Sequence, residues 1–114
     1  RVPFSNRHLR LYRNCLQIPG AVARFMFFYS ILLDLQGPSQ KNVDDYIRRK
    51  RPNTKNMRST KGGFMETEYT YYRNQMGHTQ SNADIPFVEQ EIIRLEPDFG
   101  LLVRDAIFEQ LASR

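Results

Sequence analysis

The chain has 114 residues, of which 40% are hydrophobic, and a net charge of +5, values that suit one compact domain with a single core. Its only cysteine, Cys15, excludes an internal disulfide, which favours a cytoplasmic location over a secreted, cross-linked scaffold. The most apolar run, residues 21–35, contains Arg24 and Asp34. This run is shorter than the roughly 20 residues of a membrane span, so no membrane partner is expected.

Charge is distributed unevenly along the chain. Residues 1–65 contain 13 Lys or Arg and three acids, and residues 66–114 contain four Arg and nine acids, so the two parts carry +10 and −5. A basic half indicates an anionic partner such as nucleic acid. The alternative is that the two halves attract each other within the fold, and the sequence alone leaves both interpretations open.

Two helices are predicted in the first third of the chain. Over residues 5–17, the apolar side chains of Leu9, Tyr12 and Leu16 recur at spacings of three and four, which places them on one helical face. Residues 21–36 are apolar nearly all round, as expected of the central helix of a bundle. A Gly-Pro pair then ends this second helix.

A third helix and a loop are predicted next. Ser39 is a good N-cap for a helix over residues 40–50, and Pro52 closes it. Residues 52–64 are polar, basic and contain a pair of glycines, so we expect an exposed loop.

Two more helical segments complete the predicted fold. The fourth covers residues 65–76, and Pro86 suits the first turn of the fifth. Pro97 and Gly100 are expected to bend or split the fifth helix. No strand-like alternation competes with these helices. The predicted fold class is therefore all-α, an up-and-down bundle of four to five helices in a single domain over residues 1–114.

The fourth helix ends in the sequence RNQMGH, residues 73–78. An arginine can hold a phosphate, and a histidine can move a proton near neutral pH. On a wheel of about 100° per residue, the core stripe consists of Met65, Tyr69, Tyr72 and Met76. Thr70, Asn74 and His78 lie opposite this stripe, where His78 faces solvent, another chain or a ligand. Tyr71 lies on the polar side and is a candidate for base stacking or a dimer contact.

Arg73, Asn74 and His78 resemble the R-x4–6-H motif of the HEPN domains, an all-helical family with many metal-independent ribonucleases. The resemblance implies that Arg73 and His78 are catalytic, that Asn74 is the positioning residue, and that two motifs face each other in a homodimer. It also implies RNA cleavage through the 2′-hydroxyl, without a metal or cofactor. Some relatives have a regulatory tyrosine two residues past the histidine, where this chain has Gln80. Family habit implies an effector domain of a larger toxin or antiviral defence protein, with the remainder of that chain or a regulatory protein as a further partner.

Other residues extend this hypothesis. Glu66, two turns before Arg73, is expected to orient its guanidinium. Phosphate contacts, which give a sequence-independent and salt-sensitive affinity, are expected from the basic residues Lys41, Arg48, Arg49, Lys50, Arg51, Lys55, Arg58 and Lys61. A solvated helix face is the alternative for these residues. The alternative for the whole chain is a non-catalytic helical dimerisation or RNA-binding module. One Cys and two His match no metal-ligand spacing, so no metal site is expected.

Overall fold

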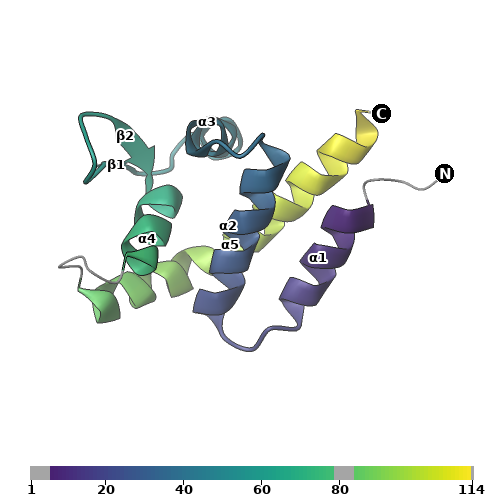
Figure 1. Ribbon diagram of the computed structural model, residues 1–114, viewed down its shortest axis with the longest axis horizontal. Coiled ribbons are helices and arrows are strands. Elements are labelled where there is room, and N and C mark those ends of the chain that lie inside the picture. The colour runs from purple at the N-terminus through teal and green to yellow at the C-terminus, as the bar shows by residue number, and fades with distance from the viewer. Residues whose placement is uncertain (1–5, 79–83, 114) are drawn as a thin grey trace.

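The computed structural model of the protein describes residues 6–78 and 84–113, and the described chain is mostly helical, as the sequence predicts (Figure 1). Its elements are, in chain order, α1 (Asn6–Leu16), α2 (Ala21–Leu35), α3 (Gln40–Lys50), β1 (Asn56–Arg58), β2 (Met65–Thr67), α4 (Glu68–Gly77) and α5 (Ile85–Ala112). None of the described helices is long and apolar enough to cross a membrane.

A small antiparallel hairpin, β1–β2, precedes the start of α4 (Figure 1). Strand β1 lies in the segment predicted as a loop, and β2 lies in the predicted start of the fourth helix. The register of the hairpin pairs Asn56 with Thr67 and Arg58 with Met65. The expectation that no strand competes with the helices was wrong because strands of three residues are too short to show a periodic pattern. The predicted start of the fourth helix at Met65 was wrong for a related reason. The Thr67 side chain accepts a hydrogen bond from the Thr70 backbone N–H, so it caps α4 and the helix begins at residue 68.

α2 lies at the centre of the core, as its nearly continuous apolar surface predicts. Phe25, Phe28 and Tyr29 are at most 1% exposed. They surround Phe99 of α5, whose ring centroid lies 4.9 Å from that of Phe25 and 5.1 Å from that of Tyr69 in α4. One aromatic cluster therefore joins α2, α4 and α5.

α5 is one continuous helix of 28 residues. Pro97 does not split it, because the lost backbone hydrogen bond falls on an exposed side of the helix, where water can solvate the Ile93 carbonyl. Gly100 permits the close approach of α2 to α5. A Cβ at this position would lie 3.0 Å from two ring atoms of Phe28, so any larger residue would have to displace a fully packed aromatic side chain.

Candidate functional site

Buried hydroxyl and carboxyl groups anchor α4 to α2 and α3. Asp44 of α3 accepts hydrogen bonds from the hydroxyls of Thr67 and Thr70, both at 2.7 Å, and from the Thr67 backbone N–H at 3.3 Å. A hydroxyl has one proton, so Thr70 Oγ1 must accept from the Tyr29 hydroxyl, 2.7 Å away. Burial raises the pKa of Asp44, and the hydrogen bonds from Thr70 and Thr67 oppose this shift. We call these four residues the Asp44 network.

α4 therefore packs on two sides. Its tyrosine side is buried, with Tyr69 and Tyr72 each 5% exposed, as the wheel predicts. Thr70 is fully buried on the opposite side, so its expected position away from the core was wrong. A wheel identifies the most apolar face of a helix, but it cannot show that polar groups of α2 and α3 bury a second face. Met65, assigned to the core stripe, is 48% exposed on β2.

The Arg73 guanidinium is directed toward α2. Its Cζ atom lies 5.1 Å from the centroid of the Tyr29 ring, and Nη1 donates a hydrogen bond to Asn74 Oδ1 at 3.0 Å. A cation over an aromatic ring is stabilised by about 0.5–2 kcal/mol, depending on its exposure. Arg73 is thus held beside the Asp44 network by one ring and one amide.

Asn74 connects this arginine to the start of α3. Its side chain and that of Gln40 form a reciprocal amide pair, with N–O distances of 3.1 and 3.2 Å. Its Nδ2 atom also lies 3.5 Å from Glu66 Oε1. Glu66 was expected to orient the Arg73 guanidinium, but no contact between the two is found among the described residues. Glu66 contacts the Asn74 amide instead. Burial and the nearby charge of Asp44 raise the pKa of Glu66.

His78 follows the last residue of α4 and is exposed. Its extended backbone redirects the chain, and its N–H contacts the Gln75 carbonyl at 3.4 Å. Asn74 and His78 line the same pocket of about 500 Å³, whereas Arg73 is not among the lining residues. Arg73 therefore hydrogen-bonds to Asn74, and Asn74 shares a pocket with His78, but Arg73 and His78 do not line one pocket together. Gln80 lies outside the described residues.

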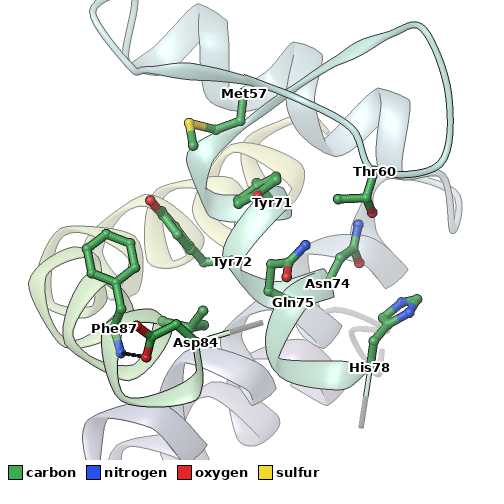
Figure 2. A pocket seen from close by; sticks show the side chains of 10 residues that line it. Met57, Thr60, Tyr71, Tyr72, Asn74, Gln75, His78, Asp84 and Phe87 are labelled. Atoms are coloured by element: carbon green, nitrogen blue, oxygen red, sulfur yellow. Dashed lines mark hydrogen bonds between the residues drawn. The ribbon is translucent and has the colours of Figure 1, made fainter. Parts of the chain in front are cut away.

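The pocket has a polar wall and an aromatic wall. Figure 2 shows Thr60, Asn74 and His78 on one side and Tyr72 and Phe87 on the other. Tyr71 also lines the pocket, and Tyr72 contacts both aromatic neighbours edge-on, at centroid distances of 5.2 Å to Tyr71 and 6.3 Å to Phe87.

Phe87 is one of the apolar residues of α5, but it is 49% exposed. The sequence contains a signal for this. Phe87 and Val88 are adjacent, hence about 100° apart on the helix, and Val88 is the one that is buried.

Five of the eight basic residues expected to contact RNA have intramolecular partners. Lys50 pairs with Glu109, Arg51 with Asp98, and Lys41 and Arg48 with Asp45, and Arg49 stacks on Tyr46. The ion pairs of Lys50 and Arg51 join the basic part of the chain to the acidic part. The two oppositely charged halves therefore do attract each other within the fold, one of the two interpretations that the sequence left open.

Lys55, Arg58 and Lys61 are exposed, and no ion pair involves them among the residues that the structure describes. They belong to β1 and the turns on either side of it. Met57 and Thr60 of the same segment line the pocket. Within the predicted basic segment, the cations that have no ion-pair or aromatic partner among the described residues therefore lie on the same segment as two pocket-lining residues.

The pair of Arg51 and Asp98 gives a pH-dependent prediction. Hydrogen bonds from Arg51, at 2.9 Å, lower the pKa of Asp98 below 3.8. A lowered pKa means that the ionised carboxylate stabilises the fold above the unfolded-state pKa and loses this effect as the pH falls through the folded value. Asp98→Asn should therefore be less stable than wild type at pH 7, and the difference should vanish in acid, as measured by urea denaturation.

The control for this prediction is Asp105→Asn. Asp105 meets Arg104 only at 3.5 Å with both side chains exposed, so its loss should matter little at any pH. A difference between wild type and Asp98→Asn that persists at pH 2 would contradict the prediction.

Neither a metal cluster nor a relative helps to define the site. Within residues 6–78 and 84–113, no group of three or more His, Cys, Asp or Glu side chains is placed to hold a metal ion. No protein family, curated protein or solved structure was found to match the chain.

Proposed function

We propose that the protein is a HEPN-type, metal-independent endoribonuclease domain that acts as a homodimer, with α2 to α5 as its up-and-down bundle. The observation that carries the proposal is that Asn74 and His78 line one pocket while Arg73 hydrogen-bonds to Asn74. Arg73, Asn74 and His78, to which we assign phosphate binding, positioning and proton transfer, all lie in the last turns of α4 or directly after it.

The reaction is attack of a ribose 2′-hydroxyl on the neighbouring phosphate. It needs a base for the hydroxyl proton, stabilisation of charge on the phosphate, and an acid for the leaving 5′-oxygen. One chain supplies a single histidine at this pocket. A two-fold dimer supplies two copies of His78, one for each proton transfer.

Arg73 reaches the phosphate by exchanging its partner. Its contact with Tyr29 is worth about 2 kcal/mol, whereas hydrogen bonds to a charged group contribute about 1.5–3 kcal/mol each and a guanidinium can make two of them. A phosphate in the pocket therefore competes successfully with the ring. Gln40 keeps the Asn74 amide in place through two hydrogen bonds, so Asn74 stays fixed when the Arg73 guanidinium turns from Tyr29 toward the phosphate.

The experiment that tests the proposal is cleavage of a single-stranded RNA in the presence of EDTA. We expect products that end in a 2′,3′-cyclic phosphate, and we expect DNA of the same sequence to stay intact because it lacks the 2′-hydroxyl. Cleavage of the DNA, or a requirement for added divalent metal, would contradict the mechanism.

A second function is favoured by the position of Arg73 against Tyr29, outside the pocket lining. If the guanidinium never leaves that ring, the domain is a non-catalytic dimerisation or RNA-binding module. RNA would then bind to the wild type without being cut under any condition of the assay.

A further inference from the structure

We infer that the pocket beside His78 binds one unpaired nucleobase of the RNA, stacked on Phe87; this inference rests on the proposed function for the identity of the ligand. Phe87 lies in the first turn of α5, lines the pocket and is 49% exposed. A half-exposed phenylalanine in a concave site offers apolar area that an aromatic ligand can cover.

The size and walls of the pocket suit a base. Its volume of about 500 Å³ lies within the range of roughly 300–1,000 Å³ that is usual for small-ligand sites. Figure 2 shows the amide of Gln75 and the hydroxyl of Thr60 across the pocket from the Phe87 ring, whereas the Asn74 amide is already occupied by Gln40, Arg73 and Glu66. Amides and hydroxyls both donate and accept hydrogen bonds, so they can meet the polar edge of a base whose face lies on the ring.

The charges around the pocket suit a phosphate backbone. Arg58 and Lys61 are exposed on the same segment that contributes Thr60 to the polar wall. Asp84 also lines the pocket and would repel a phosphate. Its carboxylate, however, accepts a hydrogen bond from the Phe87 backbone N–H at 3.2 Å and caps α5. Two exposed cations therefore lie on a segment that borders the pocket, while the Asp84 carboxylate is engaged by the start of α5.

An unpaired base is required because the aromatic wall lies inside a pocket. A base in a duplex is stacked between its neighbours and cannot enter, whereas a base in a single strand can turn out of the chain. Stacking of this kind tolerates any base, since every base has an aromatic face. The inference therefore concerns a preference for single strands, and not for a sequence.

The experiment measures binding separately from cleavage. The probe is a fluorescein-labelled, single-stranded 2′-O-methyl RNA 12-mer, which cannot be cleaved through its 2′-oxygen, and fluorescence anisotropy gives its Kd. Phe87→Ala should raise the Kd about tenfold, and Phe87→Leu, which keeps the apolar volume but removes the ring, should do nearly the same. The matched control is Phe108→Ala, which removes a 48% exposed phenylalanine near the other end of α5 and should leave the Kd unchanged.

The outcomes separate this inference from the proposed function. An unchanged Kd for Phe87→Leu, or an equal loss with a double-stranded probe, overturns the base pocket. If that happens while the wild type still cuts ordinary RNA, the nuclease proposal stands alone. If Phe87→Leu weakens binding but no RNA is ever cut, the pocket stands and the catalytic proposal fails.

Discussion

His78→Ala is expected to lower the rate of RNA cleavage by about a thousandfold or more while leaving the helix content unchanged. General acid or base catalysis by one side chain contributes about 10²–10⁴-fold, and in a two-fold dimer the substitution removes both proton-transfer groups at once. The fold should tolerate the change because His78 is exposed and lies after the end of α4. Product formation from a labelled RNA and far-UV circular dichroism are the two measurements.

His8→Ala is the matched control for this variant. It removes the other histidine of the chain, which lies on α1 and contacts Asp34 at 2.7 Å, and it should retain the parental rate. A His78→Ala protein that cuts RNA as fast as His8→Ala would show that the pocket histidine takes no part in the reaction.

Asp44→Ala is expected to cause the largest loss of stability, about 3 kcal/mol or more. The substitution leaves the hydroxyls of Thr67 and Thr70 and one backbone N–H without their acceptor in a buried site. Each unsatisfied buried group costs about 1–3 kcal/mol. Relief of the desolvation that raises the pKa of Asp44 offsets only part of that cost. A domain of this size is stable by about 5–15 kcal/mol in total, so the urea midpoint should fall strongly.

Two substitutions distinguish this network from ordinary surface charge. Asp45→Ala changes the next residue, whose carboxylate pairs with Lys41 and Arg48 on the surface, and should cost less than about 1 kcal/mol. Asp44→Asn keeps an oxygen that can accept from the threonines, so it should be intermediate. Equal midpoints for Asp44→Ala and Asp45→Ala would show that the Asp44 network does not anchor α4.

The bounds of the first three helices could be predicted closely because their signals are local, although Leu16 of the predicted apolar face of α1 is 50% exposed. Ser39 caps α3 as expected, and the continuous apolar surface of residues 21–35 marks the central helix. The hairpin could not be predicted, because pairing Asn56 with Thr67 is a contact between segments that show no period of their own. The continuity of α5 through Pro97 likewise depends on which side of the helix the missing hydrogen bond faces.

The candidate site was predictable only as a set of residue types. The motif identified Arg73, Asn74 and His78. It could not show that Gln40, 34 positions before Asn74, hydrogen-bonds to the Asn74 side chain. Five of the eight predicted RNA-binding cations have intramolecular partners, and among the described residues Lys55, Arg58 and Lys61 have no ion pair. The sequence could not show this, because the fold decides which acids lie beside a lysine or arginine.

Chemistry and sequence order belong to the chain itself: a helix with a polar, basic end, an arginine that can hold an anion, and a histidine that can transfer a proton. Geometry belongs to the tertiary structure. Packing of α4 between α5 on one side and α2 with α3 on the other buries Thr70, turns Arg73 onto Tyr29 and leaves Phe87 half-exposed across the pocket from His78 (Figure 2). Side-chain direction in a packed helix is set by the neighbours on every side, and those neighbours come from segments far away in sequence.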